Sequence, residues 1–246
     1  MNVGIVIQAR LGSTRLPAKI LKPLQGKTVL EYCVDNMRSV RGIGSVVVAT
    51  TTSEQDDSLV DFCGKKKIDF FRGSETNVLE RYVHAAEAYR LDAVVRITSD
   101  CPFSDPFVVE DVLKTFLSKP CDLASNVIDR TYPRGLDTEI VRTECLKELL
   151  AMHPDSFYLE HVTPYFYEHP EKYKLISVTA EAKLRHPEYR ICIDTPEDYE
   201  LLKKIASHLP TDQPYRAEQI VDLFDQNPAW KDINAHVFHL KHKGKT

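Results

Sequence analysis

The sequence predicts an α/β protein built on a mostly parallel sheet. Short apolar runs rich in β-branched residues alternate with amphipathic helical patterns through the first hundred residues. Unbroken apolar runs are typical of strands buried on both faces, and parallel strands need helical crossovers between them. With 246 residues, 43% of them hydrophobic, the chain is long enough to bury a large core.

Strands and helices alternate strictly in the first half of the chain. The predicted strands cover Val3–Ile7, Ser45–Thr51, Asp69–Arg72 and Ala93–Thr98, and the predicted helices cover Thr28–Val40, Glu54–Lys66 and Asn77–Arg90. Helical crossovers between successive strands make the strands parallel, so their carboxyl ends share one edge of the sheet, and such crossovers are nearly always right-handed. Ligands of open α/β sheets bind beyond that edge.

The second half keeps this alternation less strictly. Helices are expected at Pro106–Leu117, Thr143–Met152, Phe157–Glu168, Thr195–Ser207 and Arg216–Gln226, and strands at Asp122–Ser125, Asp137–Val141, Tyr173–Val178 and Tyr189–Ile193. Without an internal repeat or a low-complexity linker, residues 1–246 are expected to form one domain. Two strands lack a clear parallel partner, so residues of about 128–179 are expected to form an inserted arm for substrate contacts or dimerisation.

Composition limits the classes of function. The net charge of −4 argues against broad nucleic-acid binding, which needs a basic face. Six scattered cysteines without a Cys-x-x-Cys pair predict reduced thiols, and neither a signal peptide nor an apolar run of membrane-spanning length is evident, so a cytoplasmic protein is expected. Residues of about 228–246 predict a basic, flexible tail, in which a metal site at His236, His239 and His242 is the less favoured interpretation.

The segment "QARLGSTRLPAK", Gln8–Lys19, follows the first predicted strand directly. Arg10 and Arg15 offer planar guanidinium groups that match phosphate geometry, and Lys19 offers a point charge. Backbone N–H groups near Gly12 and Ser13 can form an anion-binding nest. The segment matches neither standard phosphate-loop motif. It predicts a polyphosphate site, with a solvated basic loop as the alternative.

The longer stretch "IQARLGSTRLPAKIL" resembles the nucleotide-binding signature of the CMP-sugar synthetases, I-P-A-R-x-x-S-x-R-L-P-x-K. It is most similar to the 3-deoxy-manno-octulosonate cytidylyltransferases and the SpsF-like spore coat polysaccharide proteins, and Gln8 in place of proline favours the SpsF-like branch. The resemblance implies a Rossmann-like, three-layer α/β/α nucleotide-diphospho-sugar transferase fold of GT-A type. It also implies a cytidylyltransferase that joins CTP to an acidic, sugar-like acceptor, and a homodimer.

The resemblance assigns roles within the signature. Arg10 and Lys19 are expected to be catalytic, together with Asp100. The expected nucleotide-binding residues in the signature are Ala9, Arg10, Gly12, Ser13, Arg15 and Lys19.

The resemblance implies that two aspartates hold Mg²⁺. Asp100 in "ITSDCPFSDP" follows the fourth strand, and Asp194 in "IDTPED" follows a later one. Mg²⁺ prefers a few carboxylates together with phosphate oxygens. The alternative for Asp100 is a turn before Cys101-Pro102, whereas helix capping accounts for Thr195–Asp198 but not for Asp194.

Further blocks carry the remaining candidates. Arg72, Ser74 and Asn77 follow the third strand and are expected near the nucleotide base, with helix capping as the alternative for Ser74. Glu80 and Arg81 fit an ordinary helix surface. The resemblance also extends to "YPRGLDTEIV" and "LEHVTPYFY", and it implies substrate binding by Arg134, Asp137 and Glu139 in the first and by Glu160 and His161 in the second.

Two other functions remain open at this point. A GT-A type glycosyltransferase of polysaccharide synthesis would use an activated nucleotide sugar, but it usually carries a D-x-D pair, which is not found near a strand end here. A non-catalytic nucleotide-binding protein would have no need of Lys19, Asp100 and Asp194 together.

Overall fold

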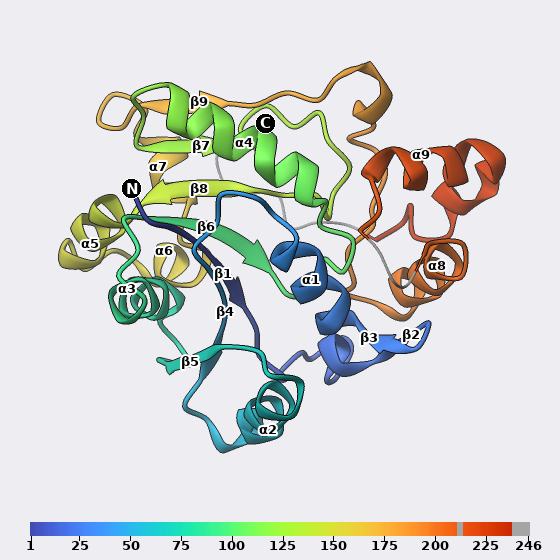
Figure 1. Cartoon of the computed structure of the whole chain (residues 1–246), viewed down its shortest axis with the longest axis horizontal. Helices are drawn as coiled ribbons and strands as arrows, with labels where there is room; N and C mark the ends of the chain where they lie inside the picture. Colours follow the sequence, from blue (N-terminus) through green and yellow to red (C-terminus); the bar gives the residue numbers. More distant parts are fainter. Residues whose placement is uncertain (211–213, 238–246) are drawn as a thin grey trace.

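The computed structural model describes residues 1–210 and 214–237. Its main sheet has seven strands in the order β5-β4-β1-β6-β8-β7-β9 (Figure 1). The four strands β1 (Val3–Gln8), β4 (Ser45–Thr51), β5 (Phe70–Gly73) and β6 (Ala93–Thr98) are parallel. β1 lies between β4 and β6, so its carboxyl end opens at the middle of the sheet edge, where the segment from Gln8 begins.

The other three strands make the sheet mixed. β8 (Glu139–Arg142) runs antiparallel to β6 and to β7 (Leu123–Ser125), and β7 pairs in parallel with β9 (Leu175–Ser177). The predicted fold class, a mixed and mostly parallel sheet between helices, is confirmed. β8 and β9 come from the predicted arm; the boundaries of that arm and its role in dimerisation stay predictions.

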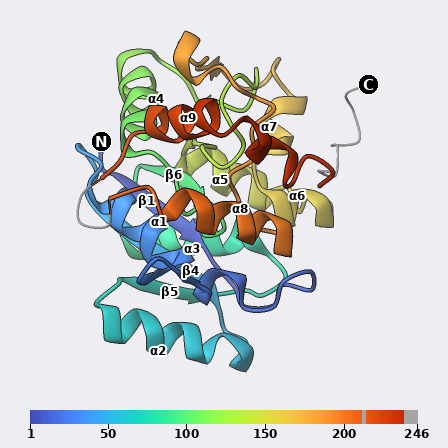
Figure 2. The same cartoon turned by 90° about the vertical axis from the view of Figure 1, so that its right-hand side faces the viewer.

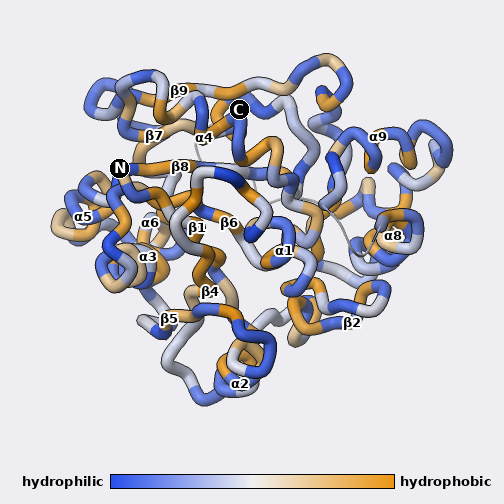
Figure 3. The backbone as a smooth tube through the Cα atoms, in the orientation of Figure 1, coloured by the Kyte–Doolittle hydropathy of each residue, from blue (hydrophilic) through white to orange (hydrophobic). Residues whose placement is uncertain are grey.

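Helices cover both faces of the sheet. α1 (Val29–Arg38), α2 (Asp57–Lys66) and α4 (Pro106–Ser118) share one apolar cluster with Ile5 and Ile7. α3 (Val78–Ala88), α5 (Thr143–Ala151), α6 (Ser156–His161) and α7 (Pro164–Glu168) lie on the opposite face, where Val6 packs. Successive β1 residues thus face opposite layers, as expected for a strand buried on both sides. Figure 3 shows hydrophobic colour concentrated along β1 and β4.

A third apolar cluster lies beyond the sheet edge and holds α8 (Pro196–Ala206) and α9 (Ala217–Gln226). Figure 2 shows these two helices side by side with α1 and α4. The small hairpin of β2 (Pro23–Leu24) and β3 (Lys27–Thr28), which was not predicted, contributes Leu24 to the same cluster.

Asp105 connects the α4 layer to α9. Its carboxylate accepts from the backbone N–H of Phe107 (2.6 Å), which caps α4, and from that of Ala217 (2.5 Å) at the start of α9. Burial raises the pKa of Asp105 to about 6, and its backbone hydrogen bonds oppose that rise only in part. One buried carboxylate therefore caps two helices.

The predicted elements are wrong in two places. The predicted helix Phe157–Glu168 is divided into α6 and α7, because Val162 takes a positive φ of 69° and so leaves the helical conformation. The predicted strand Tyr189–Ile193 forms only a single bridge between Arg134 and Arg190. Gly135 lets the two segments approach this closely, since a Cβ there would lie 2.8 Å from the backbone carbon of Ile191.

Other expectations concern thiols, the tail and membranes. All six cysteines are free; five are buried and Cys192 is partly exposed. His236 is exposed and lies 4.0 Å from Glu197, whereas His239 and His242 lie outside the described residues. Within the described part of the chain, every helix is too short or too polar to traverse a lipid bilayer.

Candidate active site

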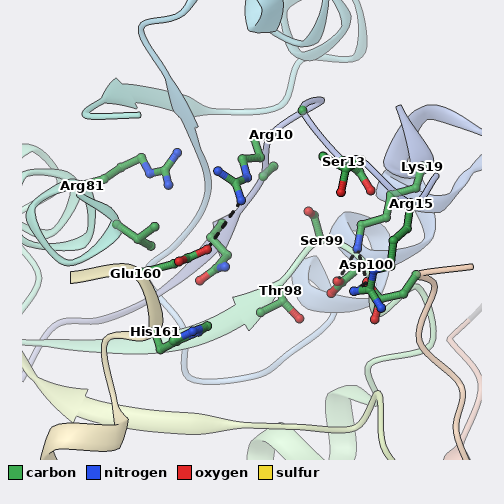
Figure 4. A pocket seen from close by; sticks show the side chains of 16 residues that line it. Arg10, Ser13, Arg15, Lys19, Arg81, Thr98, Ser99, Asp100, Glu160 and His161 are labelled. Atoms are coloured by element: carbon green, nitrogen blue, oxygen red, sulfur yellow. Dashed lines mark hydrogen bonds and ion pairs between the residues drawn. The ribbon is translucent and has the colours of Figure 1, made fainter. Parts of the chain in front are cut away.

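A pocket of about 410 Å³ opens at the carboxyl ends of β1 and β6 (Figure 4). Strand pairing aligns Gln8 of β1 with Thr98 of β6, so the loops that follow both strands meet at the pocket. α3 and α6 close one side. The lining residues are Gln8, Ala9, Arg10, Gly12, Ser13, Thr14, Arg15, Lys19, Val78, Arg81, Thr98, Ser99, Asp100, Glu160, His161 and Asp194.

The loop after β1 is folded by its own backbone and by one buried carboxylate. The Leu11 N–H donates to Asp56 (2.7 Å), and the N–H groups of Ser13 and Ala18 donate to the Leu11 carbonyl (2.8 and 3.3 Å). Ala18 has a left-handed backbone (φ 49°), which turns the chain into a 3-10 helix at Lys19–Leu21. This turn places Lys19 at the edge of the pocket.

One end of the pocket holds a lysine between two aspartates. Lys19 Nζ lies 2.7 Å from Asp100 Oδ2 and 2.8 Å from Asp194 Oδ1, and Arg15 Nη2 lies 3.0 Å from the same Asp194 oxygen. Burial opposes the charge on Lys19, whose side chain is 13% exposed, but the two carboxylates prevail and raise its pKa above the usual range. Lys19 is therefore an ammonium ion held by two carboxylates.

The same cluster keeps Asp194 ionised. Burial favours its neutral form, but Lys19, Arg190 and Arg15 outweigh burial and hold the pKa of Asp194 below its usual value. Its second oxygen, Oδ2, accepts from Arg190 Nη2 at 2.7 Å. The two oxygens of Asp194 thus have different partners, one inside the pocket and one behind it.

The other end of the pocket is lined by α3 and α6. Arg81 of α3 is 2% exposed, and its Nε and Nη1 have no hydrogen-bond partner among the described residues. Desolvation, and then the nearby Arg10, lower the pKa of Arg81 from the ordinary arginine value, although arginine remains protonated. Arg10 itself points toward Glu160, with 3.7 Å between Nη2 and Oε1 (Figure 4).

Ten of the predicted site residues line this one pocket. They come from the loop after β1, from the ends of β6 and the segment before α8, and from α6: Ala9, Arg10, Gly12, Ser13, Arg15, Lys19, Asp100, Asp194, Glu160 and His161. The structure therefore brings the predicted phosphate loop and both predicted metal ligands together. Their roles in binding and catalysis stay predictions.

The predicted base contacts lie outside this lining. Arg72 donates to the carbonyls of Thr51 (2.8 Å) and Ser53 (3.0 Å) and pairs with Asp57. The Ser74 hydroxyl accepts from the Asn77 N–H, and the Asn77 side chain caps α3. These side chains have local structural partners here.

The residues predicted in "YPRGLDTEIV" also lie outside the lining. Asp137 accepts two hydrogen bonds from Arg130 (2.7 and 2.8 Å); these overcome burial and hold the pKa of Asp137 below its usual value. Glu139 is buried between Arg96 (2.5 Å) and the Tyr167 hydroxyl. Arg134 is half-buried, and desolvation followed by the neighbouring Arg130 lowers its pKa.

The residues at the lysine end fit a magnesium ion by their donor chemistry. Asp100 and Asp194 each turn one oxygen toward the same point, where a single compact cation, the Lys19 ammonium, already lies. Mg²⁺ is typically bound by one or two carboxylates plus substrate phosphates. Among residues 1–210 and 214–237, no group of three or more His, Cys, Asp or Glu side chains is arranged to hold a metal. The two aspartates would therefore need phosphate oxygens of the substrate as further ligands of the ion.

Comparison with known proteins identifies the family of this chain. The family model for cytidylyltransferases matches residues 4–229. The chain belongs to the cytidylyltransferase family. It is 33% identical to the spore coat polysaccharide biosynthesis protein SpsF of Bacillus subtilis over 232 residues, which covers 92% of this chain and 95% of SpsF. The resemblance drawn from the signature is thereby confirmed.

Solved structures agree with this assignment. A cytidylyltransferase from Leptospira borgpetersenii superimposes with a TM-score of 0.88 at 33% identity, covering 98% of this chain and all of the other. A CMP:2-keto-3-deoxy-manno-octonic acid synthetase in complex with CTP gives a TM-score of 0.64 at 18% identity, covering 84% of this chain and 99% of the other. The second likeness shows that the fold is shared.

Arg81 is a pocket residue that the sequence analysis did not select. It was assigned to an exposed helix surface, but it lies on the buried face of α3. Its position falls in the apolar stripe of that helix, at Val78, Tyr82 and Ala85, which are all buried. A cation inside an apolar stripe was the available signal, because an arginine is almost never buried without a partner or a function.

Proposed function

We propose that the protein transfers a cytidylyl group from CTP to an acidic, sugar-like acceptor and releases pyrophosphate. The observation that carries this proposal is the convergence of Lys19, Asp100 and Asp194 beside the basic loop, in a chain of the cytidylyltransferase family. The name of SpsF supports a place in the synthesis of a surface polysaccharide.

In the proposed reaction an acceptor oxygen attacks the α-phosphorus of CTP in line, and pyrophosphate leaves. The transition state demands positioning and charge neutralisation more than covalent participation of the protein. Arg10, Arg15 and Lys19 would neutralise the triphosphate and the leaving group, and the backbone at Gly12 and Ser13 would donate to phosphate oxygens.

Asp100 and Asp194 would hold Mg²⁺. When bound, the ion would neutralise phosphate charge at this end of the pocket. Lys19 holds both aspartates in the structure, and its ammonium lies in the pocket lining, where it would donate to phosphate oxygens. The same two side chains thereby keep the pocket ordered before ligands arrive.

The opposite end of the pocket suits the rest of the nucleotide or the acceptor. Arg81 offers donors that lack acceptors within the described residues, and Arg10, Glu160 and His161 lie around the same space. A carboxylate or a ring carbonyl would supply the missing acceptors. We assign the base to Arg81 and keep Arg134 and Asp137 as candidates for the acceptor.

The deciding experiment incubates the protein with each of the four nucleoside triphosphates, Mg²⁺ and a panel of acidic sugars, and measures pyrophosphate. We expect release only with CTP and a matching acceptor. Consumption of a nucleotide sugar without pyrophosphate from any triphosphate would overturn the proposal in favour of a glycosyltransferase.

A substitution tests the metal assignment in a separate measurement, a titration of nucleotide binding with Mg²⁺. Asp100→Asn keeps the size of the side chain but removes its charge, so we expect it to abolish the dependence of nucleotide binding on Mg²⁺. An unchanged magnesium titration in this variant would reject Asp100 as a ligand.

We also propose the homodimer that the resemblance to the family implies. Light scattering on the wild-type protein tests it, and a monomeric mass would reject it.

A further inference from the structure

A buried carboxylate lies directly behind the pocket. Asp198, in the first turn of α8, is fully buried (0% exposed) and is not part of the pocket lining. It accepts from Arg190 Nε and Nη2 (2.7 and 2.8 Å), from Asn234 Nδ2 (2.8 Å) and from two backbone N–H groups. A helix cap needs only the reciprocal bonds with Thr195, which are also present. The remaining donors exceed what capping requires.

Arg190 joins this carboxylate to the pocket. Its Nη2 donates both to Asp198 Oδ2 (2.8 Å) and to Asp194 Oδ2 (2.7 Å). Asp198 Oδ2 also accepts from the backbone N–H of Asp194 (2.8 Å). Asp194 is therefore held at its backbone and at one carboxylate oxygen, so its other oxygen, Oδ1, is directed to Lys19.

Asn234 fixes the same assembly from the segment that follows α9. It is 3% exposed, and its Nδ2 donates to the Arg190 carbonyl (3.1 Å) and to Asp198 Oδ1 (2.8 Å). One side-chain amide thus sets the distance between the backbone that precedes Asp194 and the helix that follows it. Neither Arg190 nor Asn234 lines the pocket.

We propose that Arg190 and Asn234 are positioning residues for Asp194, and that the segment around Asn234 thereby completes the active site. This inference rests on the proposed function, in which Asp194 binds the metal. Hydrogen-bonded partners behind a ligating side chain fix its orientation and tune its affinity, and their removal typically weakens metal binding about 10–100-fold. Asp198 acts through Arg190, as the counter-ion that keeps the guanidinium in place.

The test compares three variants. Arg190→Lys keeps the charge but loses the planar fork that reaches both aspartates. Asn234→Ala removes the bridging amide. Ile233→Ala is the matched control, because Ile233 is the neighbouring residue and packs on the α8–α9 cluster, yet it contributes no side-chain hydrogen bond to Arg190 or Asp198.

Binding of Mn²⁺, a probe for Mg²⁺, is measured by the electron paramagnetic resonance of the free ion at saturating CTP, together with thermal unfolding. We expect Arg190→Lys to weaken Mn²⁺ binding about 10–100-fold and Asn234→Ala to weaken it about tenfold. CTP binding without metal should stay near the wild-type value. Ile233→Ala should lower the melting temperature as Asn234→Ala does, without changing the Mn²⁺ affinity.

Wild-type Mn²⁺ affinity in folded Arg190→Lys and Asn234→Ala would overturn the inference, as would an equal loss in Ile233→Ala. Failure of the metal assignment gives a different result, since the wild-type protein itself would then bind no Mn²⁺, and failure of cytidylyl transfer appears separately, as absence of pyrophosphate release from CTP. In that case a crystal structure of Asn234→Ala decides: displacement of the Asp194 carboxylate from Lys19 supports the positioning role, and an unmoved carboxylate rejects it.

Discussion

The two ends of the candidate active site both carry cations, but the cations differ in how closely carboxylates hold them. Lys19 and Arg15 contact Asp100 and Asp194 at distances of 2.7 to 3.0 Å. At the other end Arg81 is buried with two nitrogen donors that no described residue satisfies.

The two ends therefore differ in how firmly the unliganded protein holds them and in how they would respond to a ligand. The Lys19 end is held in shape by its own ion pairs, so a ligand there must exchange partners with groups that are already satisfied. Leaving buried donors of Arg81 unsatisfied costs free energy in the unliganded protein, and a ligand that supplies an acceptor recovers it. The Lys19 end therefore has its geometry formed before a ligand binds, whereas the Arg81 end would select ligands that carry an acceptor for its donors.

The largest expected effect is that of Lys19→Ala. Loss of a group that stabilises transition-state charge typically slows turnover about 10²–10³-fold. Asp194 keeps Arg15 and Arg190 as partners, so we expect the fold to persist. Pyrophosphate release and thermal unfolding measure the two effects. Lys22→Ala, three residues further on and outside the pocket lining, is the control, and near-normal turnover of Lys19→Ala would remove the lysine end from the mechanism.

Arg81→Met separates binding from stability. We expect CTP affinity to fall about 10–100-fold, since a hydrogen bond to a charged group contributes about 1.5–3 kcal/mol. The free energy of unfolding should rise by about 1–2 kcal/mol, because the buried donors that lack partners are removed. Calorimetric titration and chemical denaturation test both effects. His84→Ala, exposed on the same helix, is the control. A destabilised variant with normal CTP affinity would make Arg81 structural.

The smallest effect on function is expected at Asp105, a buried acid outside the pocket lining whose hydrogen-bond donors are backbone N–H groups. Its pKa is about 6 instead of about 3.8, so the folded state binds a proton more tightly than the unfolded state does. Its stabilising contribution is complete below about pH 4 and is lost as pH rises through about 6, with a total of about 3 kcal/mol at most. Denaturation of wild type and Asp105→Asn at pH 4 to 7 should show their difference shrinking as pH rises. A pH-independent difference would contradict this.

The strands and helices of the first half could be predicted because local patterns determine them. The run at Ser45–Thr51 is apolar throughout, and the structure pairs it on both sides, with β1 and β5. The prediction failed at Tyr189–Ile193, whose apolar residues pack in the α8–α9 cluster instead of a ladder. A buried apolar run does not reveal whether its hydrogen-bond partners belong to a sheet.

The site was predictable where it follows strand ends. Lys19, Asp100 and Asp194 each follow a predicted strand, and all three meet at the sheet edge, although the third of those strands is irregular in the structure. The role of Asn234 could not be predicted, because it follows no strand end and its amide reaches Arg190 across 44 residues. Arg190 lies only four and eight residues before Asp194 and Asp198, but its place in an apolar run predicted a strand instead of these contacts. Arg72 illustrates the opposite case: it follows a strand end, but carbonyls of the neighbouring loop accept its hydrogen bonds.

The ion pairs of Lys19 also determine the stage of protein synthesis at which the pocket can form. Lys19 and Asp100 are 81 residues apart in the chain, whereas Lys19 and Asp194 are 175 residues apart. A nascent chain that ends between Asp100 and Asp194 contains the basic loop and β6 but lacks the part of the pocket that Asp194 provides. Chains begin to fold from the N-terminus as they are made, so under the proposed function we expect nucleotide binding only from chains that extend past Asp194. Fragments released after different lengths of synthesis can be tested for retention on immobilised CTP. The shortest fragment retained would show how much of the chain the pocket requires.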